Sequence, residues 1–113
     1  MTADCLFCRI VRKEIPATIV LETEHVVAFR DIDPKAPTHM LVVPRVHVAT
    51  LDVATDASML GELQLAAAAI ARTEGIVEGG YRTVINCGAD AGQTVFHVHL
   101  HLLGGRKLGW PPG

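Results

Sequence analysis

The sequence lacks any hydrophobic run long enough to cross a membrane. A transmembrane helix needs about 20 consecutive apolar residues, and no run in these 113 residues approaches that length. The first segment, MTADCLFCRI, also lacks the basic start and apolar core that are typical of a secretory signal. We therefore expect a cytoplasmic protein that makes no use of a membrane.

The sequence also lacks a large excess of positive or negative charge, and it lacks an even number of cysteines. Ten Lys and Arg face twelve Asp and Glu, the net charge is -2, and the cations are scattered. No basic stripe is present, so a nucleic-acid duplex is not an expected partner. The three cysteines are an odd number, which argues against a disulfide framework and for reduced thiols in the cytosol. The length, without repeats, predicts one domain over residues 1–113.

Hydrophobic residues, in contrast, are abundant. They make up 50% of the chain, and the mean hydropathy is +0.33. A domain of this size with so many hydrophobic residues has more apolar side chains than its core can bury. We therefore expect a subunit interface to cover some of them.

Periodicity and turn residues predict an α+β fold with an antiparallel sheet, because the strands come in consecutive groups. His25 is expected to be exposed without a partner, and Cys87 to be packed. Asp4 is expected to cap the first helix, and Gly75 to end the second. The expected helices are 4–14 and 56–74, and the expected strands are 18–23, 25–31, 39–44, 81–88 and 94–103.

The segment FHVHLHLLGG, residues 96–105, places three histidines at every second position. Successive side chains of a strand point to opposite faces. His97, His99 and His101 are therefore expected on one face, while the intervening aliphatic residues pack against a helix on the other.

Three interpretations of this pattern compete. The histidines could form a polar, solvent-facing sheet surface. Alternate histidines on a strand can also chelate a catalytic metal, although no carboxylate flanks the run. In phosphoryl chemistry, one neutral imidazole attacks phosphorus while its neighbour serves the leaving group. The spacing alone does not separate the last two interpretations.

The run HVHLHLL resembles the signature of the histidine triad (HIT) superfamily. FCRIVRKEIP, AFRDIDPKAPTHMLVVP, GYRTVINCGADAGQTVFHVHLHLLGGR and WPPG extend the resemblance over nearly the whole chain, to the Hint branch of purine nucleoside phosphoramidases. The resemblance implies a five-stranded antiparallel sheet with one long and one short helix, continued across a homodimer. It also implies hydrolysis of the P–N bond of purine nucleoside 5'-phosphoramidates such as AMP-lysine.

The resemblance also implies the catalytic roles. His99 matches the nucleophile, which forms a nucleotidyl-histidine intermediate, and the backbone carbonyl of His97 accepts from its other ring nitrogen. His101 matches the residue that contacts the α-phosphate and helps the leaving group. His39 matches a fourth histidine that supports the site, and no cofactor is expected for catalysis.

The nucleotide contacts follow from the same resemblance. Asp31 matches the carboxylate that binds the ribose hydroxyls, and Trp110 belongs to a tail that reaches the partner subunit's site. Asn86, Gln93 and Thr94 match positions that hold the phosphate and the leaving group, with Thr94 where the family usually has Ser. The purine slot is expected to be formed by Phe7, Ile10, Phe29, Ile32 and Leu41.

The pair Cys5 and Cys8 has the C-x₂-C spacing of half a zinc site. Two small core residues on a short helix would give the same pattern. Some HIT proteins, mainly of bacterial type, bind a structural zinc through such a pair and two histidines, which here match His47 and His97. We therefore expect zinc at these four residues, with His97 serving both sites.

Two other functions stay open. A dinucleoside polyphosphate hydrolase of the same superfamily would use the same triad, but the GGR and WPPG segments argue against it. A purine-nucleotide-binding interaction protein with vestigial catalysis is the other possibility, and the intact triad argues against that one.

Overall fold

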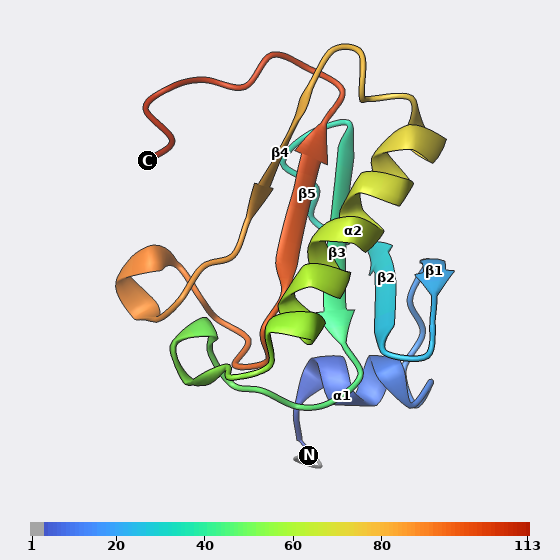
Figure 1. The fold of residues 1–113 in the computed structure, drawn as a ribbon, viewed down its shortest axis with the longest axis vertical. Coiled ribbons are helices and arrows are strands. Elements are labelled where there is room, and N and C mark those ends of the chain that lie inside the picture. Colours follow the sequence, from blue (N-terminus) through green and yellow to red (C-terminus); the bar gives the residue numbers. More distant parts are fainter. Residues whose placement is uncertain (1–3) are drawn as a thin grey trace.

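The fold is a twisted five-stranded antiparallel sheet with a long helix across one face and a short helix at one end (Figure 1). The computed structural model describes residues 4–113. The strands lie in the order β1-β2-β3-β5-β4, which confirms the expected α+β class. The elements are α1 (Leu6–Val11), β1 (Ile19–Glu22), β2 (Val26–Arg30), β3 (Thr38–Pro44), α2 (Ala57–Glu74), β4 (Tyr81–Val84) and β5 (Leu100–Gly104), with short 3-10 helices at Leu51–Val53 and Ala89–Ala91.

The sheet separates two hydrophobic clusters. On one face, α2 packs on aliphatic residues of β2, β3 and β5, including Val42, Leu100 and Leu102. On the other face, α1 packs through Phe7 on alternate residues of β2 and β3, such as Leu41. Neighbouring residues of β3 therefore serve different clusters, as strand geometry requires. The short α1 covers only part of its face, and this leaves room for a site.

Helix α2 agrees closely with the expectation. The Asp56 carboxylate accepts from the backbone N–H of Met59 at 3.2 Å and so caps the first turn. Gly75 ends the helix in the left-handed conformation, with φ of 72°. In the described part of the chain, no helix is both long and apolar enough to cross a membrane.

The expected cap of α1 was wrong by one residue. Cys5, in extended conformation, is the N-cap, and its Sγ accepts from the backbone N–H of Cys8 at 3.4 Å. Asp4 is exposed and lies one residue before the cap. The helix ends at Val11 because Lys13 turns the chain with φ of 62°.

The last two strands are shorter than expected. β5 starts at Leu100, because the Val98 N–H donates to the carbonyl of Val48 at 2.7 Å rather than to β3. The segment before Leu100 nevertheless keeps the expected alternation: Val98 joins the α2 cluster, whereas His97 and His99 contact Phe7.

The β4 strand ends at Val84, and the chain then leaves the sheet. Cys87, expected to be packed, is exposed in the turn that follows. Gly88 then opens the loop to the short 3-10 helix, with a φ of 88° that favours glycine.

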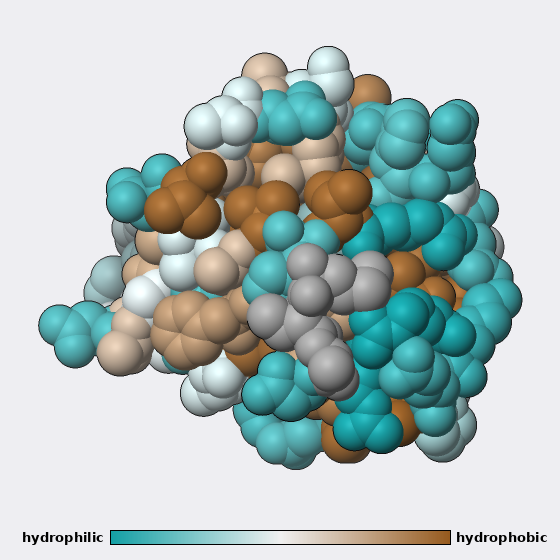
Figure 2. Space-filling view, turned by 90° about the horizontal axis from the view of Figure 1, so that it is seen from below, coloured by the Kyte–Doolittle hydropathy of each residue, from teal (hydrophilic) through white to brown (hydrophobic). Residues whose placement is uncertain are grey.

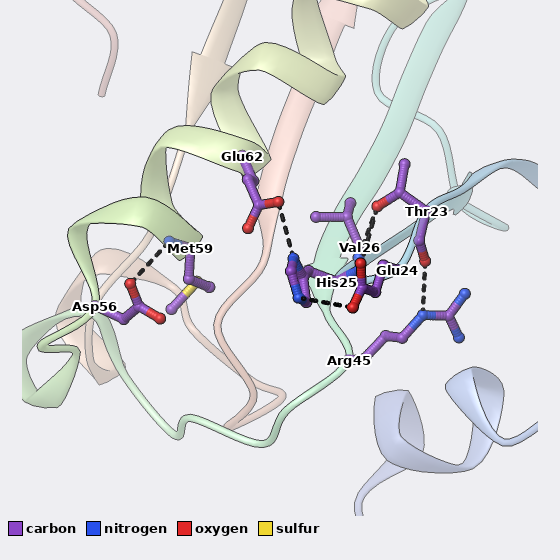
Figure 3. A network of polar contacts seen from close by, with 8 residues as sticks. All are labelled: Thr23, Glu24, His25, Val26, Arg45, Asp56, Met59 and Glu62. Carbon is purple, nitrogen blue, oxygen red and sulfur yellow. Dashed lines mark hydrogen bonds and ion pairs between the residues drawn. The ribbon is translucent and has the colours of Figure 1, made fainter.

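His25, expected to be exposed and without a partner, is exposed but paired. In the β1–β2 turn its Nδ1 lies 3.0 Å from a Glu62 oxygen of α2, and Glu24 lies on its other side (Figure 3). Arg45 donates to the carbonyl of Thr23 at 2.9 Å and ties the same turn to the end of β3. These contacts connect the β1–β2 hairpin to α2, and they do not involve the sheet face on which α1 packs.

Part of the hydrophobic surplus stays on the surface. The end of the molecule seen in Figure 2 shows separate brown, hydrophobic areas between teal, hydrophilic ones. Among residues 4–113, the exposed large hydrophobic residues are Leu6, Ile32, Val46, Val53, Leu65, Val77, Tyr81, Phe96 and Trp110.

Candidate functional site

A cavity of about 380 Å³ opens on the α1 face of the sheet. Its walls are apolar side chains from α1, from the segment that enters β1, and from β2 and β3. One end is closed by His99 and His101. Nine residues singled out from the sequence line it: Phe7, Ile10, Phe29, Asp31, Ile32, Leu41, Thr94, His99 and His101. Ile15 and Ala17 also line it, and nothing in the sequence pattern pointed to them.

His99 is held with one ring nitrogen available. Its Nδ1 lies 2.8 Å from the carbonyl oxygen of His97, which can only accept, so Nδ1 carries the proton. The neutral ring then has its lone pair on Nε2. The side chain is 7% exposed and lies edge-on to Phe7, with ring centroids 5.0 Å apart. His99 is therefore a fixed imidazole with a nucleophilic nitrogen at the cavity wall.

The tautomers of His39 and His101 follow from a backbone group. The N–H of Lys35 donates to Nδ1 of His39 at 2.9 Å, so the proton of the neutral His39 ring is on Nε2. That Nε2 lies 2.9 Å from Nδ1 of His101, which must accept. His101 consequently carries its proton on Nε2. The sequence did not point to the Lys35 amide, because every residue except proline has one.

Burial keeps both of these rings neutral. It lowers the pKa of His39, against the opposing charge of Asp31, whose carboxylate lies 3.4 Å from Nε2. Burial, with smaller contributions from His99 and His39, lowers the pKa of His101 to about 4. Near pH 7 His101 is a neutral hydrogen-bond donor.

A second, more polar cavity of about 270 Å³ adjoins the first. Asn86, His39 and Lys35 line it, and it shares Asp31 and His101 with the apolar cavity. His101 therefore stands between a slot suited to an aromatic base and a space suited to a polar group.

Gln93 and Trp110 are not among the described residues that line these two cavities. Trp110 was expected at the partner subunit's site, not at the site of its own chain. Gln93 is buried, and its amide bonds only to backbone: it accepts from Gly88 and donates to Ala49 and Val95. Trp110 is exposed and lies over the guanidinium of Arg82, 5.6 Å from the ring centroid.

The four expected metal ligands, Cys5, Cys8, His47 and His97, converge in one cluster. The Sγ atoms of Cys5 and Cys8 lie 3.4 and 3.5 Å from Nδ1 of His97, and Nδ1 of His47 lies 3.3 Å from Sγ of Cys8. All four ligand atoms lie within 4.8 Å of one another. Adjacent S and N ligands of tetrahedral zinc are about 3.5 Å apart. The spacing therefore fits this ion.

The hydrogen bonds around the cluster also fit a metal. Nε2–H of His97 donates to the carbonyl of Pro44 at 2.8 Å, so the Nδ1 lone pair faces the two sulfur atoms. A ligating histidine ordinarily donates its other N–H in this way. The Cys8 N–H donates to Sγ of Cys5 at 3.4 Å, which orients that sulfur beside the other ligand atoms.

A second group, Asp31, His39 and His101, has ligand atoms equally close together. Here the hydrogen bonds argue against a metal. The Lys35 N–H occupies the Nδ1 lone pair of His39 and leaves a proton, not a lone pair, on Nε2. The chemistry of this donor set is therefore that of a hydrogen-bonded chain.

Comparison with known proteins agrees with this geometry. A model of the HIT domain matches residues 12–108. This chain belongs to the HIT family. It is 47% identical to the purine nucleoside phosphoramidase of Escherichia coli, over 96% of this chain and 93% of that protein. It is 48% identical to a 14 kDa zinc-binding protein of Zea mays, over 96% and 87% of the two chains.

Among solved structures, a HIT family hydrolase from Legionella pneumophila superposes with a TM-score of 0.95. It is 49% identical and covers 97% of this chain and all of its own. The chain thus has the HIT fold: a five-stranded antiparallel sheet with one long helix. In this HIT protein the triad is the run from His97 to His101.

Proposed function

We propose that the protein hydrolyses the P–N bond of purine nucleoside 5'-phosphoramidates, such as AMP-lysine, to a nucleoside monophosphate and an amine. The observation that carries the proposal is the state of His99. Its Nδ1–H is bound to the His97 carbonyl at 2.8 Å, and its Nε2 is available beside an apolar cavity. The Escherichia coli relative, named a purine nucleoside phosphoramidase, supports the same assignment.

The apolar cavity suits a purine, and Asp31 at its edge suits the ribose hydroxyls. Phe29, Leu41 and Ile10 supply flat or branched apolar surface for the base. Binding the nucleoside there places the α-phosphate next to His99 and His101. The leaving amine then extends toward the polar cavity that Asn86 lines.

In the first step Nε2 of His99 attacks phosphorus, a P–Nε2 bond forms and the P–N bond to the amine breaks. The His99 ring becomes cationic, which strengthens its Nδ1–H bond to the carbonyl of His97. Nε2–H of His101 donates to the phosphoryl oxygen or to the leaving nitrogen, where negative charge develops. Water then breaks the P–Nε2 bond. The leaving nitrogen takes up a proton from solvent as the P–N bond breaks, and the attacking water later returns one proton to solvent. Over the cycle one water therefore supplies the hydroxyl on phosphorus and the proton on the amine.

Zinc has a structural part in this proposal. Cys5, Cys8, His47 and His97 would hold the ion, which would join α1, the loop after β3 and the segment before β5 in one cross-link. His97 then has two functions: its ring binds the metal, and its carbonyl orients His99. The maize relative is named a zinc-binding protein, which supports this assignment.

We further propose that two copies of the chain form a homodimer through β4. β4 is a sheet edge with unpaired backbone groups on its outer side. Pairing of two such edges would continue the sheet across a homodimer and cover exposed apolar residues such as Tyr81. The tail with Trp110 leaves the sheet beside this edge, since Arg82 of β4 donates to the carbonyl of Gly109 at 2.9 Å. Sedimentation analysis of the purified protein tests the dimer.

Incubation with adenosine 5'-phosphoramidate and with AMP-lysine, followed by chromatography, tests the reaction. We expect AMP and the free amine from the wild type and neither from His99→Ala. Faster turnover of a diadenosine polyphosphate would instead favour a polyphosphate hydrolase. Saturable AMP binding without turnover of any phosphoramidate would favour a binding protein.

A further inference from the structure

The turn that follows β5 reaches across to the β2–β3 loop, just before His39. Nη2 of Arg106 donates to the carbonyl oxygen of Lys35 at 2.8 Å, and Nη1 donates to the carbonyl of Lys107 at 3.0 Å. The second bond fixes the guanidinium against its own turn. Lys35 is thus held on its carbonyl side by Arg106 and on its amide side by the His39 ring.

Close packing of the two segments explains why the turn contains glycine. Gly105 has φ of 91°, and a Cβ at this position would lie 2.9 Å from Cβ of Pro37. Only a residue without a side chain lets the turn approach the β2–β3 loop this closely. The approach brings the Arg106 guanidinium to the Lys35 carbonyl.

The Lys35 amide controls the direction of the hydrogen-bond chain. If its N–H moved away from Nδ1 of His39, that ring could carry its proton on either nitrogen. If the His39 proton were on Nδ1, its Nε2 would present a lone pair to Nδ1 of His101. The His101 proton would then be on Nδ1, to donate to that lone pair. Nε2 of His101 would then be an acceptor, facing the negative charge of a phosphoryl oxygen.

We propose that Arg106 is a positioning residue for His101. By holding the Lys35 carbonyl it keeps the Lys35 N–H on His39 and the His101 proton on Nε2. This inference rests on the proposed function for the use of that proton, but the tautomer itself is a property of the free protein. Arg106 itself is not among the described residues that line the apolar cavity.

Three variants test the proposal. Arg106→Ala removes the bond to Lys35, and Arg106→Lys keeps a single donor. Lys107→Ala is the control, because it removes one positive charge from the same turn and keeps the backbone carbonyl to which Arg106 donates. The readouts are kcat and KM for adenosine 5'-phosphoramidate, and nitrogen NMR of the histidine rings in the ligand-free protein.

For Arg106→Ala we expect kcat to fall by about two- to tenfold, the range that corresponds to one hydrogen bond, with KM unchanged. The ring nitrogen signals of His39 and His101 should shift toward a mixture of tautomers. Arg106→Lys should recover part of both effects, and Lys107→Ala should match the wild type.

Wild-type ring signals in Arg106→Ala would overturn the proposal, as would a rise in KM without a fall in kcat. An equal loss in Lys107→Ala would also overturn it, by assigning the effect to local charge. A wild type without phosphoramidase activity would refute the proposed function only, because the NMR comparison needs no substrate.

Discussion

The ring of Phe7 stands nearly perpendicular to that of His99, at 84°, with centroids 5.0 Å apart. Phe7 lies in α1, between the two cysteines of the expected zinc site. The helix α1 and its N-cap, which supply two of the four proposed zinc ligands, therefore also contact the proposed nucleophile. Edge-to-face contacts of this kind restrict ring rotation in a packed site.

Removal of the nucleophile should abolish turnover and spare the fold. For His99→Ala we expect kcat to fall by about 10³-fold or more, measured with adenosine 5'-phosphoramidate. His25→Ala is the matched control, because His25 is exposed in the β1–β2 turn and contacts Glu62. A His99 variant as fast as the wild type would refute the mechanism.

Loss of a metal ligand should remove zinc and lower the melting temperature. Cys8→Ser is the variant, and Cys87→Ser is the control, since Cys87 is exposed and lies outside the cluster. Elemental analysis of protein purified without chelator should give about one zinc per wild-type chain and much less for Cys8→Ser. Well under one zinc in the wild type would contradict the site.

Acid should destabilise the protein through His101. Burial lowers the pKa of this ring from the ordinary 6.5 to about 4, and His99 and His39 act in the same direction against Asp31. Between pH 6.5 and about 4, this histidine binds a proton in the unfolded chain but not in the folded one. Its contribution to the free energy of unfolding is therefore complete above pH 6.5 and is lost as the pH falls toward 4. Melting temperatures across this range should decline less steeply in His101→Asn. An identical slope in that variant would show that other groups cause the decline.

A side chain at Gly105 should be poorly tolerated. Gly105→Ala places a Cβ where φ is 91° and where Pro37 lies 2.9 Å away. We expect a loss of at least about 1–2 kcal/mol of unfolding free energy, measured by urea titration. Gly79→Ala is the control, because a Cβ there meets no described atom within 4 Å. Equal effects of the two substitutions would exclude this explanation.

Gln93 should act on stability rather than on substrate binding. Its amide satisfies three backbone groups, so Gln93→Ala should cost about 1–3 kcal/mol for each buried group left without a partner. The exposed Gln64 on α2 provides the control Gln64→Ala. We expect a lower melting temperature with little change in KM. The reverse pattern would return Gln93 to the phosphate site.

The sequence allowed prediction of the sheet, the long helix and the residues around the cavity, because these depend on local periodicity or on a recognisable motif. Leu63, Ile70 and Asp56 follow helical rules that need no tertiary information. The side of each residue in the run from His97 to Leu102 was likewise correct, although the regular strand covers only its second half.

The remaining features depend on contacts between distant segments. The Lys35 amide, the Arg106 guanidinium and the Gln93 amide gained their partners only when separate loops met. Cys5, rather than Asp4, caps its helix, and its Sγ also lies 3.4 Å from Nδ1 of His97 in a distant segment. A backbone N–H carries no sequence signal, so the tautomers of His39 and His101 required the structure.

Because side chains alternate between the two sheet faces around His99, this segment tolerates no shift of its strand register. Insertion or deletion of one residue between β4 and the triad could be absorbed by the loop, but the same change between His97 and Leu102 would exchange the two faces. The imidazoles of the triad would then lie in the hydrophobic core under α2, and aliphatic side chains would line the cavity instead. Length variation among natural or engineered versions of this chain should therefore be confined to its turns.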